Sequence, residues 1–324
     1  MIALEVIEDR DRLRNFEPEW IEFTRRRVPD NPFQRCEWLM TWWSHFGSGA
    51  PRVMVFRHGQ EMAGILPCFL HEWNGRRQMT LQGSGVSDYL DPLFDSEHAG
   101  EIVRQIRTEL ARRADWDLCD WQDLSRGTPL ACLGEVIDET PCSAITIDQP
   151  FDAYFAGRPK DLKRNLRGDR RKAEATGYVT FEAAATADPE LLDALIELHG
   201  ARWARLGQAG MIESNGSEPF LRDVAERFAA SGGLRFFALR FAGRIVAVVL
   251  AFCGRTTIFG YLSAFDPRYE EFGFGRELLL QALRYGNEHG YRRWDFLRGE
   301  EPYKFSWGAE RVEKCRVLIR PACL

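Results

Sequence analysis

The sequence has no long apolar run and no closely spaced pair of cysteines. Its longest uncharged apolar stretch, residues 245–253, is nine residues long, whereas a membrane-spanning helix needs about 20. The eight cysteines are scattered without any C-x-x-C spacing, which argues against a zinc ribbon and against a disulfide framework. We therefore expect no membrane-spanning helix, no metal site, and cysteines that are reduced and mostly buried.

The sequence does not predict a secretory leader, and it has no strong charge of either sign. Residues 1–16 are acidic and mixed, without the basic start and apolar core of a signal peptide, which predicts a cytoplasmic protein. The net charge is −5, with 45% hydrophobic and 28% charged residues, a composition typical of globular domains. Because this charge argues against a general nucleic-acid binder, no nucleic-acid partner is expected.

The length of 324 residues suits two domains of about 150 residues each. Each half has helix-like and strand-like patterns in a similar order, and residues 148–157, which include Pro150, are predicted to connect the halves. We predict an α/β fold in the broad sense, with a mixed sheet of the α+β kind flanked by helices. Its two domains are expected to comprise residues 1–150 and 151–324.

Residues 256–289 carry the most informative pattern, namely an apolar strand, a turn, a glycine loop and a long helix. Free amides and the positive helix end favour an anion at such a loop, here Gly273, Phe274 and Gly275. The full G-x-G-x-x-G fingerprint is absent, so a nicotinamide cofactor is not expected. A pyrophosphate carrier such as coenzyme A needs only amides and a cation, for which Arg276 is the candidate. A glycine-capped helix start without a ligand explains the loop equally well.

The strand before this loop, residues 258–265, is a candidate for holding the arm of the same carrier. If it diverges from its neighbour, its amides can pair with an extended ligand that contains amide groups, such as pantetheine. An ordinary buried strand is the alternative. The residues expected to bind the carrier here are Leu262, Ser263, Ala264 and Phe265.

Two further clusters combine titratable and aromatic residues. His199, Arg202 and Trp203 share one face of a predicted helix. A neighbouring arginine favours the neutral histidine, which suits a general base, although a surface histidine beside a packing tryptophan is also consistent. The second cluster follows a short strand, at the edge where ligand sites gather in α/β folds. It contains Asp295, Arg298, Glu300, Glu301, Tyr303 and Lys304, of which Asp295, Arg298, Tyr303 and Lys304 are the candidate site residues.

Two segments are less specific. The loop 87–91 contains Asp88 and Tyr89 and is either a site with catalytic carboxylates or a turn capped by aspartate. Residues 158–172 are strongly basic and form either a solvated helix face or a contact for phosphate, on a carrier, an anionic lipid surface or RNA.

Taken together, segments in both halves resemble the CelD-like, cellulose-biosynthesis-associated GNAT acyltransferases, which are relatives of the FemABX peptidyltransferases. The resemblance covers nearly the whole chain, and it rests on PFQRCEWLMTWW, SDYLD, KRNLRGDRRK, ELHGARW and DFLRGEEPYKFSWGAE. It implies two GNAT-like domains in tandem, with residues 1–150 on the acceptor side and residues 151–324 binding the acyl donor. The usual donor loop begins with Arg or Gln, whereas this chain has Glu270 there.

The resemblance implies an N-acyltransferase that uses acetyl-CoA or a longer acyl-CoA and needs no metal. The acceptor is expected to be a small amine-bearing sugar, lipid or peptide. His199 is the candidate base with Asp295 in reserve, Tyr303 or Tyr261 the proton donor to the thiolate, and Lys304 the contact for an anionic group.

Asp88, Tyr89, Arg202, Trp203 and Arg298 are the candidate substrate contacts. Two alternatives stay open, a FemABX-like transfer from aminoacyl-tRNA and a non-catalytic scaffold in polysaccharide biosynthesis. Contact with an anionic membrane surface or with polysaccharide machinery is also an expectation.

Overall fold

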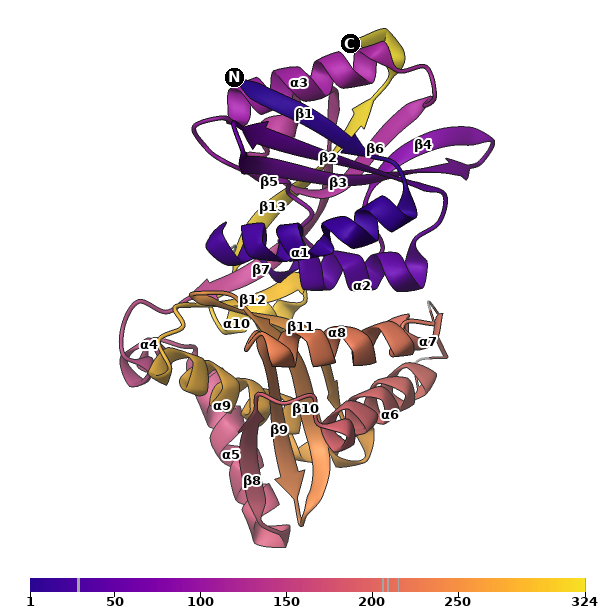
Figure 1. Cartoon of the computed structure of the whole chain (residues 1–324). Helices are drawn as coiled ribbons and strands as arrows, with labels where there is room; N and C mark the ends of the chain where they lie inside the picture. Colours follow the sequence, from indigo (N-terminus) through magenta and orange to yellow (C-terminus); the bar gives the residue numbers. More distant parts are fainter. Residues whose placement is uncertain (28–29, 206, 209, 215, 324) are drawn as a thin grey trace. The chain divides into compact units, whose positions relative to one another are not determined.

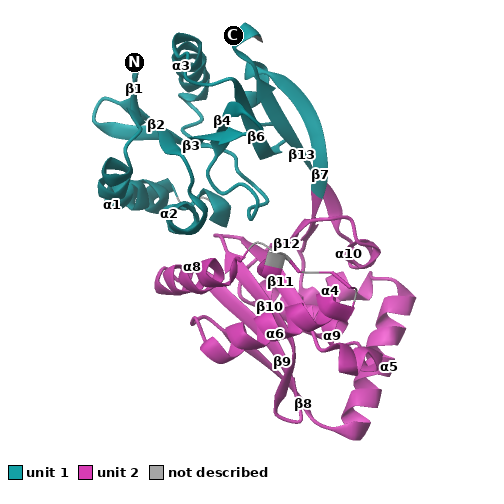
Figure 2. Ribbon diagram, turned by 90° about the vertical axis from the view of Figure 1, so that its right-hand side faces the viewer, with its two compact units in different colours: residues 1–141, 312–324 teal, residues 142–311 magenta. Residues whose placement is uncertain are grey.

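The computed structural model describes residues 1–27, 30–205, 207–208, 210–214 and 216–323 (Figure 1). It divides the chain into two compact units, unit 1 (residues 1–141 and 312–324) and unit 2 (residues 142–311) (Figure 2). No helix among the described residues is long and apolar enough to cross a membrane. Each of the seven cysteines with a described side chain is a free thiol, and only Cys132 is exposed.

Unit 1 is a mixed sheet with helices on both faces. The strands follow the order β1-β2-β3-β4-β6-β13-β7, β5 pairs with β3, and β4 and β6 run parallel. The elements are β1 (Ile2–Ile7), α1 (Arg10–Arg27), α2 (Cys36–Phe46), β2 (Ala50–His58), β3 (Glu61–Trp73), β4 (Arg76–Leu81), β5 (Leu93–Phe94), α3 (Ala99–Arg112), β6 (Leu118–Ser125), β7 (Glu135–Thr146) and β13 (Glu310–Ile319). The apolar face of α3 packs into a core with alternate residues of these strands.

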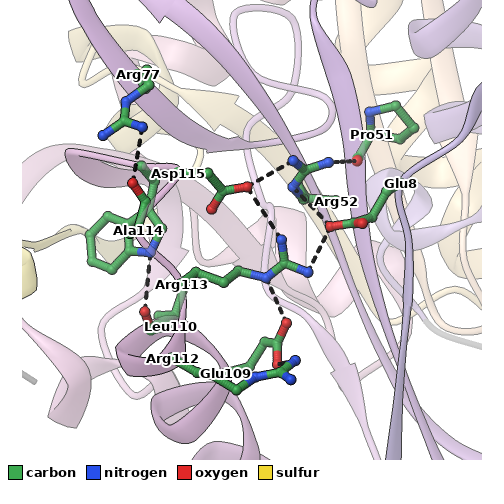
Figure 3. Close-up of polar contacts among 11 residues, drawn as sticks. Glu8, Pro51, Arg52, Arg77, Glu109, Leu110, Arg112, Arg113, Ala114 and Asp115 are labelled. Atoms are coloured by element: carbon green, nitrogen blue, oxygen red, sulfur yellow. Dashed lines mark hydrogen bonds and ion pairs between the residues drawn. The ribbon is translucent and has the colours of Figure 1, made fainter.

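A network of charged side chains ties the end of α3 to the first strands (Figure 3). Arg113 contacts Glu109 and Glu8, each at 2.6 Å, and Arg52 contacts Glu8 at 3.3 Å and Asp115 at 2.9 Å. Glu109 is only 5% exposed. Since this carboxylate is buried, its ion pairs are screened less by water than ordinary surface pairs are.

Unit 2 has the strand order β7-β12-β11-β10-β9-β8, in which only the β11–β12 pair is parallel. The elements are α4 (Phe151–Ala156), α5 (Lys160–Thr176), β8 (Val179–Ala184), α6 (Pro189–Arg205), α7 (Met211–Ser214), α8 (Glu218–Ala230), β9 (Leu234–Phe241), β10 (Arg244–Cys253), β11 (Thr257–Phe265), the 3-10 helix η3 (Pro267–Phe272), α9 (Phe274–Glu288), β12 (Arg293–Arg298) and α10 (Pro302–Ser306).

Helices cover both faces of this sheet because successive strand residues point to opposite sides. Phe237 and Leu239 of β9 pack in one core with α5 and α9. Phe252 of β10 packs instead against Phe228 of α8, at a ring-centroid distance of 4.7 Å. The face covered by α5 and α9 is therefore distinct from the face covered by α8.

The division differs from the sequence prediction in two respects. The chain leaves unit 1 within β7, after Pro141, and not in the Pro150 segment. It also returns to unit 1 within β13, so residues 312–324 belong to unit 1 and not to the domain predicted to bind the acyl donor. The physical reason is pairing at a distance in sequence, because β13 is hydrogen-bonded to β6, for example at Cys315 opposite Leu124.

Candidate functional site

Strands β11 and β12 of unit 2 begin as a parallel pair and then separate. Their register joins Thr257 to Arg293 and ends at Phe259 opposite Asp295. Beyond that point β11 continues to Phe265 and pairs with β10 on its other side. Strand β12 pairs on its far side with β7, up to Arg298 opposite Cys142. The divergence on which the carrier hypothesis depends is therefore present.

The direction of the β11 amides follows from one hydrogen bond. Asp266 N–H donates to Val246 O of β10, at 2.8 Å. Because N–H and C=O groups alternate in direction along a strand, Ala264 points toward β10 in the same way. The amides of Ser263 and Phe265 point to the opposite side, where β12 has diverged. Of the four consecutive residues predicted to bind a carrier, only these two have amides that point away from β10. The amides of Leu262 and Ala264 point toward β10 within the sheet.

The glycine loop between η3 and α9 has the predicted turn geometry. Gly273 has φ +59°, the left-handed region that favours glycine. It accepts hydrogen bonds from the backbone N–H groups of Arg276 and Glu277, at 2.9 and 3.1 Å. Within the described residues, the N–H groups of Phe274 and Gly275 have no hydrogen-bond acceptor. Two free amides at the positive end of a fifteen-residue helix are an arrangement that favours an anion.

The charges around this loop are already paired. Arg276 contacts Asp169 of α5 at 2.5 Å, and Glu270 contacts Arg205 of α6 at 3.0 Å. A Cβ atom added to Gly273 would lie 2.3 Å from the Asp169 carboxylate. Arg276 is thus not the free cation that the sequence prediction assumed. The guanidinium of Arg205 neutralises the Glu270 carboxylate, which would otherwise repel an anion at this loop.

His199 lies on α6 but is enclosed. It is 6% exposed, and its Nε2 accepts a hydrogen bond from Trp203 Nε1 at 3.0 Å. Burial, with a contribution from Arg202, lowers the pKa of His199, so the neutral imidazole is favoured as predicted. Its Nε2 lone pair is nevertheless occupied by the indole, which leaves that nitrogen unable to take a proton from a substrate. The contacts of His199 and Trp203 therefore fit a role in packing better than a role of His199 as general base.

Arg202, on the same helix, reaches the end of β11. Its guanidinium lies 5.5 Å from the Phe265 ring centroid, and its charge also acts on the Tyr303 hydroxyl. Phe265 in turn lies against Gly275, where an added Cβ atom would be 3.4 Å from the ring. Arg202 therefore brings the end of β11, the start of α9 and the α10 segment into one neighbourhood.

Lys304 holds the turn between β12 and α10. It is 2% exposed, and its Nζ donates to the carbonyls of Leu297, Arg298 and Gly299 at 3.4, 2.9 and 3.1 Å. It also contacts Glu301 at 2.8 Å. This differs from the predicted contact with an anionic substrate, because the ammonium is buried and already has four partners. The turn needs such support, since Leu297 is a non-glycine residue with φ +60°.

Tyr303 is the most accessible member of the predicted catalytic set, at 47% exposed. Its ring meets Phe296 edge-to-face at a centroid distance of 6.0 Å. Desolvation of the phenol and the nearby Glu301 carboxylate raise the pKa of Tyr303 to about 12, against a smaller opposing effect of Arg202. The hydroxyl therefore keeps its proton at neutral pH and can donate it. Tyr261, the other candidate donor, packs against Phe252 at 5.5 Å.

Asp295 is 1% exposed and supports the same turn. One carboxylate oxygen accepts from Leu297 N–H at 2.8 Å, and the other accepts from Arg293 at 3.3 Å. These contacts fit a capping residue better than a reserve base. Arg298 is exposed, and its backbone carbonyl is one of the acceptors for Lys304.

Asp88 and Tyr89 lie in unit 1, in a loop that is fixed by local hydrogen bonds. Tyr89 is 7% exposed, its carbonyl accepts from Asn31 Nδ2 at 3.2 Å, and its ring lies 6.0 Å from Lys314 Nζ. Asp91, at the end of the loop, accepts from the backbone N–H and hydroxyl of Ser125, at 3.0 and 2.6 Å. The loop is therefore built as a capped turn.

Comparisons with known protein families and structures show which proteins this chain is similar to. Residues 160–305 match a family model described as an acetyltransferase (GNAT) domain. The matched residues lie within unit 2, which is therefore similar to a GNAT domain over most of its length. No curated protein matches the chain. The diverging β11–β12 pair and the start of α9 both lie inside the matched residues.

Solved structures resemble the chain beyond the residues that the family model matches. FemX has a TM-score of 0.67 at 13% identity, over 92% of this chain and 95% of that one. L-PGS from Bacillus licheniformis has a TM-score of 0.57 at 13% identity, over 90% and 92%. A tandem GNAT protein from the clavulanic acid biosynthesis pathway has a TM-score of 0.53 at 13% identity, over 98% and 99%. At these identities the likeness shows the fold, and it confirms the predicted tandem GNAT-like α/β architecture.

Two residues that shape this site were not predicted from the sequence. Asp169 binds Arg276, and Arg205 binds Glu270. Both pairs join residues far apart in sequence, and the chain gives no local signal for them. Glu301, a member of the predicted cluster, contacts Lys304 and contributes to the raised pKa of Tyr303.

Proposed function

We propose that this protein transfers an acyl group from coenzyme A to an amine, at the opening between β11 and β12. One observation carries the proposal, namely the outward amides of Ser263 and Phe265 beyond the last β11–β12 pair. An amide-containing pantetheine arm can add to this strand edge as a further strand does. The match of residues 160–305 to an acetyltransferase domain supports the same chemistry.

The phosphate end of the carrier has a plausible partner in the same neighbourhood. The N–H groups of Phe274 and Gly275 begin α9, next to the Phe265 ring. A pyrophosphate there would gain the two amide hydrogen bonds and the favourable end of the helix dipole. Arg276 and Arg205 lie at the same loop, and both side chains are partly exposed. Each guanidinium has several N–H groups, so it can donate to a phosphate while it keeps its carboxylate partner.

The reaction forms an amide bond and breaks the thioester bond. The attacking amine must be neutral, and the oxyanion that forms on the thioester carbonyl needs donors, for which the outward amides of β11 are the candidates. The departing thiolate needs a proton. Tyr303 is the proposed donor, because it is the accessible member of the predicted catalytic set and carries a proton on its hydroxyl at neutral pH. Since His199 and Asp295 are both engaged, solvent is the proposed acceptor of the amine proton.

The test measures acyl transfer directly. The full chain is incubated with acetyl-CoA and a panel of amino sugars, peptide amines and lipid amines, and release of the free coenzyme A thiol is followed. Turnover that depends on an amine and falls in Tyr303→Phe supports the proposal. Thiol release at the same rate with and without amine, or no binding of acyl-CoA at all, would refute it.

A second candidate, transfer of an aminoacyl group from tRNA, is favoured by one feature of α5. Lys160, Arg164, Arg167 and Arg171 are spaced to share one face of this helix, and most of that face is exposed. A basic stripe of this kind can contact phosphates of RNA. Filter retention of charged tRNA separates the candidates, because RNA binding through phosphates must weaken steeply as salt rises. No retention at low salt would dismiss this candidate.

A further inference from the structure

Helix α5 of unit 2 carries a row of cations on the side opposite its buried side. The buried side, which includes Leu162 and Leu166, packs into the core. The opposite side holds four exposed basic side chains: Lys160, Arg164, Arg167 and Arg171. They follow one another at intervals of three and four residues, so they form a single row about 16 Å long. We call this row the basic face of α5.

The basic face is open to its surroundings, and the helix beneath it is fixed. Figure 2 shows α5 on the outside of unit 2. A Cβ atom added to Gly168, which lies beside the row, would project into open space. Ion pairs hold the other sides of the helix to α9. Asp169 contacts Arg276 at 2.5 Å. Arg170 contacts Glu277 at the same distance. The cations of the basic face are therefore presented by a rigid element.

Carboxylates do not neutralise most of the basic face. Within the described residues, Lys160, Arg167 and Arg171 form no ion pair. Arg164 contacts Asp161 at 2.8 Å, with side chains that are 72% and 75% exposed. An ion pair between two side chains this exposed is weak. The basic face therefore keeps most of its positive charge.

The cations of the basic face work against the stability of the helix that carries them. Lys160 is the first residue of α5, where the positive end of the helix dipole disfavours a cation. Lys163, Arg167 and Arg171 are spaced four residues apart, and like charges at this spacing destabilise a helix. A face that only meets water gains nothing from this repulsion. The arrangement therefore favours contact with a negatively charged partner.

The distribution of charge along the chain favours a flat partner. Residues 158–172 contain eight basic and two acidic residues, a net charge of +6, whereas the whole chain has −5, so the rest carries −11. An anionic surface that lies on one side of the molecule meets only the basic face. A folded RNA of the size of tRNA would extend past α5 and meet the acidic remainder, which repels it.

An exposed tyrosine directly follows the basic helix. Tyr178 is 63% exposed, and α5 ends two residues before it, at Thr176. Its carbonyl accepts a hydrogen bond from Ala242 N–H at 3.0 Å, which places the turn between β9 and β10 beside it. Arg244 follows that turn and is exposed. An amphipathic aromatic ring among basic residues is typical of the headgroup level of a bilayer.

We propose that the basic face of α5, together with Tyr178, docks the protein on an anionic lipid surface as a peripheral and reversible contact. The cations lie against the phosphate groups of the lipids, and the Tyr178 ring lies at headgroup level. The contact is independent of the acyl transfer proposed above.

The experiment is co-sedimentation of the full chain with large vesicles. Vesicles of phosphatidylcholine with about 30% phosphatidylglycerol are compared with phosphatidylcholine alone at about 0.05 M salt, where screening is weak. We expect binding to the anionic vesicles only, and a steep loss as salt rises. Each cation near such a surface contributes about five-fold to binding. The double variant Arg167→Gln/Arg171→Gln should therefore bind about 25-fold more weakly.

The matched control removes the same charge elsewhere in unit 2. Arg255→Gln/Arg292→Gln changes two exposed arginines that lie outside α5, and it should bind within about two-fold of the parent protein. Tyr178→Ala should bind about three-fold more weakly, because part of one ring no longer leaves water. Melting temperatures show that the variants are folded. If a variant does not fold, the lipid preference and salt dependence of the parent protein still decide.

Filter retention of tRNA, measured on the same proteins, separates the two kinds of polyanion. No binding to anionic vesicles, equal binding to both kinds of vesicle, or equal losses in the two double variants would overturn the proposal. It would also be overturned if the α5 variant lost tRNA retention while its vesicle binding stayed the same, because the basic face would then be a contact for RNA.

Discussion

Proline substitution at two adjacent positions of β11 tests whether its outward amides hold the acyl donor. Ser263→Pro removes an N–H that points away from β10, whereas Ala264→Pro removes one that the register directs toward Val248. Proline is tolerated on the free side of an edge strand but not within a ladder. The two variants therefore separate the proposed ligand contact from the sheet itself.

The expected magnitudes differ accordingly. Ser263→Pro should lose one hydrogen bond to the donor, worth about 1 kcal/mol or roughly five-fold in Kd. Its free energy of unfolding should fall by less than that of Ala264→Pro, which buries an unpaired carbonyl and should cost at least about 2 kcal/mol. Ser263→Ala changes only the side chain and should leave both quantities unchanged.

The assay is calorimetric titration with acetyl-CoA, together with urea denaturation of each variant. The reasoning fails if Ser263→Pro binds acetyl-CoA as tightly as the parent protein. It also fails if the two proline variants are destabilised equally, because the alternation of amides along β11 would then be misassigned.

Four further outcomes are expected. Tyr303→Phe should lower kcat by about 100-fold without changing the melting temperature, and an unchanged kcat would exclude Tyr303 as the proton donor. Lys304→Met should lower the free energy of unfolding by about 2–4 kcal/mol, because the carbonyls of Leu297 and Arg298 lose the Lys304 donor and that of Gly299 keeps only Ser143 Oγ; a loss below about 0.5 kcal/mol in urea denaturation would contradict this support of the turn. His199 has a lowered pKa in the folded state, so its contribution is complete above its ordinary pKa of 6.5 and is lost as the pH falls below it. In His199→Gln the melting temperature should depend less on pH below 6.5 than in the parent protein. An unchanged pH dependence would contradict this assignment. Burial alone would raise the pKa of Glu109, but hydrogen bonds from Arg113 and Arg112 lower it overall, so its contribution is present above the ordinary value of 4.5 and lost on acidification; Glu109→Gln should shrink the difference in stability between pH 7 and pH 4, which thermal melts at both values measure.

The part of the site that could be predicted from sequence is the part with strong local signals. Glycine at position 273 is favoured by the left-handed φ that the turn needs, and the apolar run before it marks a strand. These features depend on residues within a few positions of one another. The split between β11 and β12 was only a condition of the carrier hypothesis, because no pattern in the sequence predicts where two strands separate.

The remainder depends on residues that are distant in sequence. The Arg276–Asp169 and Arg170–Glu277 pairs each join positions 107 residues apart, and no local pattern fixes which arginine meets which carboxylate. Lys304 shows the same limit, since its burial results from three carbonyls that a strained turn directs inward. Strand β7 was missed because its sequence, EVIDETPCSAIT, has polar residues and a proline where an alternating pattern is expected.

The central claim is that the backbone of β11 beyond Phe259 binds the acyl donor. Amide chemical shifts of isotopically labelled protein, followed while acetyl-CoA is added, test it most directly. The account predicts saturable shifts at Ser263, Phe265 and Gly275, with much smaller shifts at Ala264. Shifts that map elsewhere in the chain while these three amides stay unchanged would contradict it.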